Sequence, residues 1–238
     1  MADAWLKSEG GRAHPAPEGQ LVRAYRLHVA GTEPRDAHFA YSAVKRALDI
    51  TGALLLLILL APLLIVIAVA IKLDTAGPVF FRQRRAGERG KSFTCLKFRT
   101  MRVGAEAEID SIRKLDVTLG PTFKTPVDPR VTRVGAVLRR YSLDELPQAF
   151  NVLFGRMSLV GPRPLIVSEL ENAPVRALGR LAVKPGLTCI WQVSGRSLIT
   201  FEQWMDMDLE YVARRSLLLD LTLLLRTPVA VLSTRGAF

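Results

Sequence analysis

The chain has 238 residues, enough for one large domain or two small ones, and 49% of its residues are hydrophobic. Its formal net charge of +11 calls for an anionic partner, such as lipid headgroups, nucleic acid or a phosphorylated substrate. The two cysteines, Cys95 and Cys189, have no metal-ligand spacing, and every histidine lies before residue 41. This pattern argues against a disulfide framework and excludes a histidine-based catalytic site in the body of the protein.

The first forty residues show no apolar period and contain several glycines, prolines and alanines. They predict a poorly ordered cytosolic extension, residues 1–40. No basic region followed by an apolar core opens the chain, so the N-terminus does not resemble a secretory signal.

The segment from Ile50 to Ile71 carries no charge and is long enough to cross a bilayer core of about 30 Å as one helix. Pro62 lies near its middle, where the missing N–H and the clash with the Ile58 carbonyl should bend or break a helix. Both flanks are basic, so charge does not orient a crossing. These features alone leave a re-entrant helix and a kinked spanning helix equally open.

Downstream, short β-prone runs at 78–81 and 92–96 flank a glycine-containing turn and predict a small hairpin. Residues 104–116 predict a charged helix and 117–130 a loop. Apolar spacing over 131–154 predicts two amphipathic helices that meet near Ser142. Loop residues dominate 155–165 and 184–197. The leucine-rich tail, 217–232, is broken by charges and a proline and suits the membrane interface.

Ser142 to Pro147 is the most informative stretch. If Asp144 is the N-cap, Pro147 becomes the third helical residue, where its missing donor has no intrahelical partner. The sequence therefore predicts that Asp144 opens the second helix. Two adjacent carboxylates there could hold Mg²⁺ on a diphosphate, and Asp144 could attack phosphorus. On this spacing alone, a capping role for Asp144 is favoured over a catalytic one.

Two further loops combine rigid backbone with polar side chains. Pro162 and Pro164 fix the backbone around Arg163, which would position a guanidinium for phosphate. The second loop, 185–196, carries Trp191, suited to stacking on a base or to the lipid interface.

Taken in order, these pieces resemble the bacterial sugar transferase family, the monotopic phosphoglycosyl transferases that prime glycan assembly. The matching residues are Lys45, Arg46, Asp49 and Pro62; Gln83, Arg85 and Gly87; Lys97 to Met101; Arg133, Gly135 and Arg139; Ser142 to Gln148; Asn151 to Leu153; Met157 to Pro164; Pro185 to Thr188; Trp191 to Val193, Gly195 and Arg196; and Asp208, Tyr211, Val212 and Asp220. Each piece is weak alone, but the ordered set is highly specific. Ala61, where the family often has Ser, and Arg156, where it is usually acidic, depart from the pattern.

The resemblance implies a mostly α (α+β) fold that is monotopic and membrane-embedded, with amphipathic interfacial helices and a small β-hairpin. Residues 41–74 would form a re-entrant membrane helix broken at Pro62, and 75–238 a cytosol-facing catalytic domain. The protein would lie on the cytosolic face of the bacterial cytoplasmic (inner) membrane. It would move a sugar-1-phosphate from a UDP-sugar to polyprenyl (undecaprenyl) phosphate with Mg²⁺ as cofactor, the first membrane step of exopolysaccharide or other surface glycan synthesis.

The resemblance also assigns residues. Asp144 looks like a nucleophile that carries a covalent phosphosugar, and Glu145 its Mg²⁺-associated partner, so both are catalytic and metal-site candidates. The candidates for substrate binding are Arg85, Lys97, Arg99, Arg139, Arg163, Gln192, Arg196 and Asp208.

Three alternatives remain open at this stage. The same reaction could proceed by direct attack in a ternary complex. A non-enzymatic basic membrane adaptor would share the charge and the apolar helix, but has no reason to carry the Asp-Glu pair beside rigid arginine loops. A nucleic-acid binder would not explain the apolar segment, and no nucleic-acid signature is present, so we expect no nucleic-acid partner. The sequence leaves open whether the protein forms a homodimer and which sugar it takes.

Overall fold

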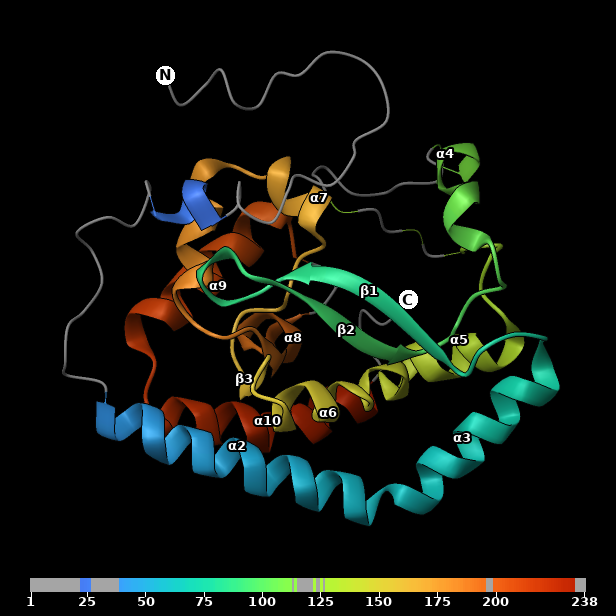
Figure 1. Ribbon diagram of the computed structural model, residues 1–238, viewed down its shortest axis with the longest axis horizontal. Coiled ribbons are helices and arrows are strands. Elements are labelled where there is room, and N and C mark those ends of the chain that lie inside the picture. The colour runs from blue at the N-terminus through green and yellow to red at the C-terminus, as the bar shows by residue number, and fades with distance from the viewer. Residues whose placement is uncertain are drawn as a thin grey trace.

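The computed structural model describes residues 22–26, 39–112, 114, 122, 125, 127–195 and 199–233. Figure 1 shows a long bent helix pair, α2 and α3, along one edge, with the hairpin β1–β2 and the remaining helices on one side of it. The described residues are mostly helical with little sheet, which confirms the predicted mostly α class.

Helix α2 (Phe39–Leu59) and helix α3 (Ala61–Asp74) meet at Leu60 with a bend of 62°. Pro62 is the second residue of α3, a position where its missing N–H leaves no helical bond broken. The predicted break at Pro62 is therefore present. Within the described residues no single helix is long and apolar enough to cross a bilayer. Taken together, α2 and α3 are long and apolar enough to cross a bilayer, by length and composition only.

Polar side chains in the middle of α2 fasten it to the rest of the molecule. Arg46 donates to two carbonyls in the last turn of α6, at 2.6 and 2.7 Å. Asp49 is buried and accepts bonds from Ser158 Oγ at 2.9 Å and from the Leu159 N–H at 2.8 Å. These bonds satisfy buried groups that would otherwise be costly, so they fix the direction in which the bent pair leaves the body.

The predicted hairpin is confirmed. Strands β1 (Phe80–Ala86) and β2 (Ser92–Phe98) pair antiparallel, with a 3₁₀ turn at Glu88–Gly90 between them. The predicted helix at 104–116 is a 3₁₀ turn, Ala105–Glu108, followed by the single turn α4 (Ile109–Ile112). Most of the loop predicted at 117–130 lies outside the described residues.

The prediction of loops at 155–165 and 184–197 is wrong in part. Strands β3 (Ser158–Val160) and β4 (Gly186–Thr188) pair in parallel, and helix α8 (Ile190–Ser194) follows. Three-residue strands are too short to show an alternating pattern, and their pairing is set by contacts distant in sequence. A Cβ on Gly186 would come within 2.1 Å of the Gly161 nitrogen, so this pairing requires glycine.

The remaining helices complete the body: α5 (Arg133–Arg140), α6 (Gln148–Leu153), α7 (Val167–Glu171), α9 (Phe201–Arg214) and α10 (Leu217–Ser233). Helix α2 packs on α6 and β3, and α3 packs on α5. Of the predicted N-terminal extension, residues 22–26 are helical, with Tyr25 buried in a core cluster, and residues 39–40 belong to α2. The rest of it lies outside the described residues.

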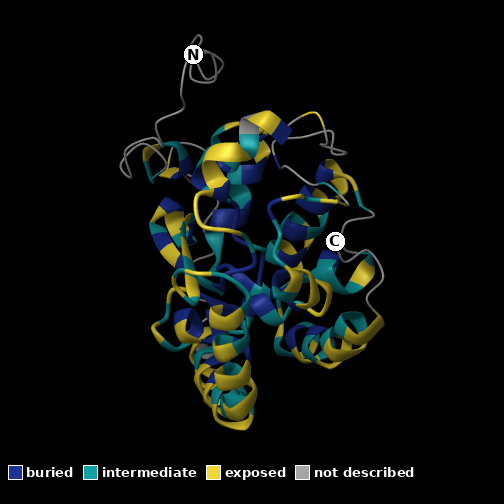
Figure 2. Ribbon diagram, turned by 90° about the vertical axis from the view of Figure 1, so that its right-hand side faces the viewer, coloured by how far each residue is buried: buried dark blue, intermediate teal, exposed yellow. Residues whose placement is uncertain are grey.

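Large apolar side chains stay exposed on α2, α3 and α10, and Figure 2 shows the α2–α3 pair mostly in the colours of exposed and intermediate residues. On the bent pair they are Val44, Leu48, Ile50, Leu54, Leu55, Ile58, Leu59, Leu63, Ile65, Val66, Val69 and Leu73. On α10 they are Leu218, Leu221, Leu225, Val229 and Leu232. Exposed apolar area of this extent marks an interaction surface.

Candidate active site

A cleft of about 770 Å³ opens between the hairpin, the α5–α6 connection and helix α8. This volume is within the usual range for small-molecule sites. Its lining includes all but two of the predicted catalytic and substrate-binding residues: Arg85, Lys97, Arg99, Arg139, Asp144, Glu145, Arg163 and Gln192. Arg196 lies outside the described residues, and Asp208 lies behind the cleft wall.

The prediction that Asp144 caps a helix is wrong. Ser142 adopts a left-handed conformation, with φ of 52°, and Asp144 sits in the middle of the 3₁₀ turn Leu143–Glu145. Helix α6 begins only at Gln148, after Pro147. The tight turn satisfies the backbone through i→i+3 bonds instead of a side-chain cap. Its consequence is that both carboxylates, Asp144 and Glu145, line the cleft.

Glu145 is held by two cations. Lys97 Nζ lies 2.9 Å from its Oε1, Arg163 Nη1 donates to its Oε2 at 2.8 Å, and Arg163 Nη2 also donates to Oε1. Burial alone would raise the pKa of Glu145, but the charges of Arg163 and Lys97 outweigh burial and hold that pKa well below its usual range. Glu145 is therefore a permanent anion whose oxygens are already occupied.

Asp144 is in a different environment although it is adjacent. Its carboxylate is 3.7 Å from Lys97 Nζ, and the residue is only 8% exposed. Burial raises the pKa of Asp144, the positive charge of Lys97 opposes the rise, and the negative charge of Glu145 adds to it. Two carboxylates whose pKa values are driven apart usually have different roles. Asp144 is the less strongly paired of the two carboxylates.

Arg139 faces Asp144 from the end of α5. Within the described residues it makes one hydrogen bond, from Nε to Thr100 Oγ1 at 3.0 Å, which leaves both Nη groups for an anionic ligand. Burial lowers the pKa of Arg139, and the charge of Asp144 opposes that change. A desolvated guanidinium with unused donors is suited to phosphate oxygens.

Arg99 and Arg85 line the cleft, but their N–H groups donate hydrogen bonds to other groups of the protein. Arg99 makes four bonds to residues 75–78, just after α3, so it holds the exit of the bent helix pair. Arg85 donates from Nη1 to the Pro164 carbonyl and from Nε and Nη2 to Gln83 Oε1. These contacts give both arginines a structural task. Their predicted contact with substrate stays a prediction.

Sequence reasoning missed Arg180, which lies in the 3₁₀ helix Val175–Ala182. Arg180 Nη2 is 2.6 Å from Asp208 Oδ2, and the same nitrogen donates to the Arg163 carbonyl. Burial raises the pKa of Asp208 to about 7, with the charge of Arg180 opposing the rise. No local pattern marks Arg180, because its partners are distant in sequence. Asp208 thus supports the cleft from behind.

The cleft fits a divalent cation only together with a substrate. Within the described residues no three His, Cys, Asp or Glu side chains are grouped to hold a metal ion. Asp144 and Glu145 are two adjacent carboxylates, and both oxygens of Glu145 already accept from cations. Mg²⁺ in phosphate-transferring sites needs only one or two carboxylates, with the other ligands from phosphates and water. Asp144 is the ligand available for such an ion.

A cleft with buried carboxylates and unused arginine donors is suited to an enzyme that acts on an anionic substrate. Residues 40–234 match the family model described as bacterial sugar transferase, and the chain belongs to that family. It is 41% identical over 198 residues to the exopolysaccharide production protein ExoY of Rhizobium meliloti, which covers 82% of this chain and 88% of that protein.

Two further relatives carry more specific names. The chain is 39% identical over 233 residues to the UDP-glucose:undecaprenyl-phosphate glucose-1-phosphate transferase of Caulobacter vibrioides, covering 94% of this chain and 82% of the relative. It is 39% identical over 199 residues to the undecaprenyl-phosphate galactose phosphotransferase of Salmonella typhimurium. That match covers 82% of this chain but 42% of the relative, so the two proteins share only part of the longer one.

Proposed function

We propose that this protein transfers a sugar-1-phosphate from a UDP-sugar to polyprenyl (undecaprenyl) phosphate, giving a polyprenyl-diphosphate-sugar and UMP. The observation that carries the proposal is Asp144, a buried carboxylate of raised pKa that faces Lys97 and Arg139 in the cleft. The names of the relatives support the donor and acceptor classes, and ExoY supports a role in exopolysaccharide synthesis.

In the proposed mechanism Asp144 is the nucleophile. Its carboxylate oxygen attacks the β-phosphorus of the donor, a P–O bond to Asp144 forms, and the bond to UMP breaks with its electron pair leaving on UMP. An oxygen of the lipid phosphate then attacks the same phosphorus, and the Asp144 carboxylate is regenerated. Lys97 and Arg139 stabilise the charge on the phosphoryl oxygens. Arg163, stacked over Trp191 at 5.8 Å, holds Glu145 in place.

Mg²⁺ belongs to the same proposal. When bound with the donor it would offset the charge of the diphosphate, which Asp144 and Glu145 would otherwise repel. Asp144 would contribute a ligand oxygen, and Glu145 could do so only by giving up one of its two cation contacts.

The proposed setting is the bilayer of the bacterial cytoplasmic membrane, entered from the cytosolic face. The bent pair α2–α3 would enter and leave by one face, because Pro62 breaks the helix and both ends pack on the same body. The exposed apolar faces of α2, α3 and α10 would be covered by lipid.

The order of product release tests the function and the covalent step together. Purified protein in nanodiscs is mixed with a panel of UDP-sugars before any undecaprenyl phosphate is added. One equivalent of UMP per enzyme should appear with the preferred sugar, and lipid-linked sugar should follow when the acceptor is added. UMP release only after the acceptor is present would overturn the covalent step in favour of direct attack in a ternary complex. Absence of transfer with every sugar would overturn the proposed function.

A further inference from the structure

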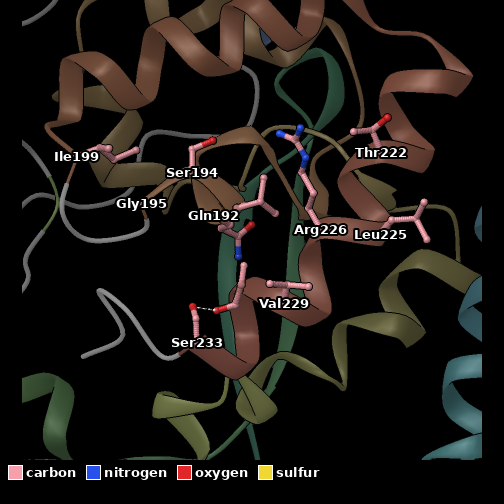
Figure 3. A pocket seen from close by; sticks show the side chains of 11 residues that line it. Gln192, Ser194, Gly195, Ile199, Thr222, Leu225, Arg226, Val229 and Ser233 are labelled. Carbon is pink, nitrogen blue, oxygen red and sulfur yellow. Dashed lines mark hydrogen bonds between the residues drawn. The ribbon is translucent and has the colours of Figure 1, made fainter.

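A second hollow lies beside the cleft. This groove, of about 730 Å³, runs between α8 and α10 and is shown in Figure 3. Its wall on α10 includes Leu225, Arg226, Val229 and Ala230. The α8 side of the groove, with Gln192, Val193 and Gly195, belongs to the family's motifs, but none of those four α10 residues does.

The groove combines mostly apolar walls with one cation. Among the described residues that line it, Arg226 is the charged one, and in Figure 3 its side chain rises from α10 beside α8. Within the described residues no hydrogen bond or ion pair joins Arg226 to another side chain. Hydroxyls from Ser194, Thr222 and Ser233 add a few polar atoms. A single cation above apolar walls matches a ligand with one anionic head and a hydrocarbon chain.

The groove is continuous with two other surfaces. Gln192, Val193 and Ala230 line both the groove and the catalytic cleft, so the two hollows are direct neighbours. Leu225 and Val229 line the groove and also belong to the exposed apolar stripe of α10. The stripe recurs at helical spacing, so it forms one face of α10. The groove therefore leads from an exposed apolar face to the edge of the cleft.

We infer that this groove binds the acceptor, with the polyprenyl chain along Leu225 and Val229 and the phosphate paired with Arg226. The inference rests on the proposed function. A bilayer phospholipid has the same general chemistry, but only the acceptor has to deliver its phosphate to the cleft that shares Gln192 with the groove. The charge of Arg226 would select an anionic head, and the apolar wall would hold the chain.

Two variants test the two halves of this site. Arg226→Gln removes the charge and keeps most of the side chain, so the KM for undecaprenyl phosphate should rise about tenfold or more, as expected for loss of a charge-assisted contact. Val229→Trp fills the groove and should raise the KM for undecaprenyl phosphate but not for a short-chain prenyl phosphate. UDP-sugar affinity, measured by calorimetry, should stay unchanged in both variants. Arg214→Gln, an exposed arginine on α9 paired with Glu210 outside both hollows, is the matched control.

The outcomes separate the inference from the function on which it rests. If the wild type transfers sugar-phosphate but both variants keep the wild-type acceptor KM, the groove does not bind the acceptor. If Arg226→Gln lost UDP-sugar affinity by the same factor as its KM for undecaprenyl phosphate rises, Arg226 would belong to the donor site. That result would also overturn the inference. So would a variant whose only change is its dependence on phosphatidylglycerol in the nanodisc, because the groove would then hold bilayer lipid. Failure of the wild type to transfer anything would instead overturn the proposed function.

Discussion

Arg180 and Asp208 form an ion pair in the interior, 2.6 Å apart, with side chains 3% and 2% exposed. Arg180 also donates to the backbone carbonyl of Arg163 and lies 5.5 Å over the ring of Trp204. Trp204 contacts Trp191 at 4.7 Å between ring centroids, and Trp191 carries the Arg163 guanidinium on its face. One connected set of contacts thus holds both the backbone carbonyl and the guanidinium of Arg163.

This arrangement predicts that the buried pair positions Arg163. Asp208→Asn leaves the Arg180 charge buried without its partner and should destabilise the fold by about 3–5 kcal/mol. The double variant Arg180→Met with Asp208→Leu removes both charges and should recover most of that stability. It should still lose about tenfold in kcat/KM for the donor, since the Arg163 carbonyl loses its donor. Thermal unfolding and UMP release measure the two effects. A stable double variant with full activity would make the pair purely structural.

Variants of Asp144 should separate stability from activity. Asp144 caps no helix, so Asp144→Asn and Asp144→Ala should both escape the loss of about 0.5–2 kcal/mol that removal of an N-cap causes. Because burial raises its pKa, the ionised Asp144 is unfavourable in the folded state at neutral pH, and both variants should be at least as stable as the wild type there. Both should lose activity by about 10³-fold or more. Chemical denaturation and UMP release test this pair of results, and substantial activity in Asp144→Asn would contradict the covalent role.

The pH profile should report Asp144. The proposed nucleophile reacts only when ionised, and burial raises its pKa above the usual value for aspartate. The rate of UMP release should therefore fall as pH is lowered through this raised pKa, above the usual value of about 4. Glu145 should not contribute, because Arg163 and Lys97 keep its pKa well below that window. A pre-steady-state pH series measures the rate, and a constant rate down to pH 4 would rule out a raised Asp144 pKa.

Removal of divalent metal should abolish turnover without unfolding the protein. Within the described residues no metal cluster is available to stabilise the fold, so EDTA should leave the thermal midpoint unchanged. Transfer should stop in EDTA and return with Mg²⁺, because the diphosphate and the two carboxylates repel each other without it. Turnover at the full rate in chelator would remove Mg²⁺ from the proposal.

The bend at Pro62 predicts that both ends of the α2–α3 pair reach one face of the membrane. Ser42→Cys in the first turn of α2 and Ala76→Cys just after α3 introduce exposed thiols at the two ends of the pair, and the native Cys95 and Cys189 are buried and should not react. An impermeant reagent should label both new sites from the same side of sealed vesicles. Labelling from opposite sides would show a spanning helix. Pro62→Ala restores the missing N–H and should shift part of the population toward spanning.

Local signals were sufficient for several parts of this protein. The hairpin followed from two β-prone runs around a glycine turn, and the helix break followed from Pro62, because both depend on residues adjacent in the chain. The spaced motif predicted the family and many of the polar side chains that line the cleft, since these residue types are visible in sequence order.

Tertiary contacts decided the rest. The 3₁₀ turn around Asp144 replaced the predicted helix start, and the parallel pair β3–β4 appeared where loops were predicted. Arg180 contacts Asp208 and the Arg163 carbonyl, which are distant in sequence and come close only in the folded protein. The physical reason is shared: a three-residue strand or a buried ion pair has no favourable energy until a distant segment supplies its hydrogen bonds. The sequence by itself therefore determined many of the polar side chains that line the cleft, and the tertiary structure decided how each of its two carboxylates is paired and what holds their neighbours in place.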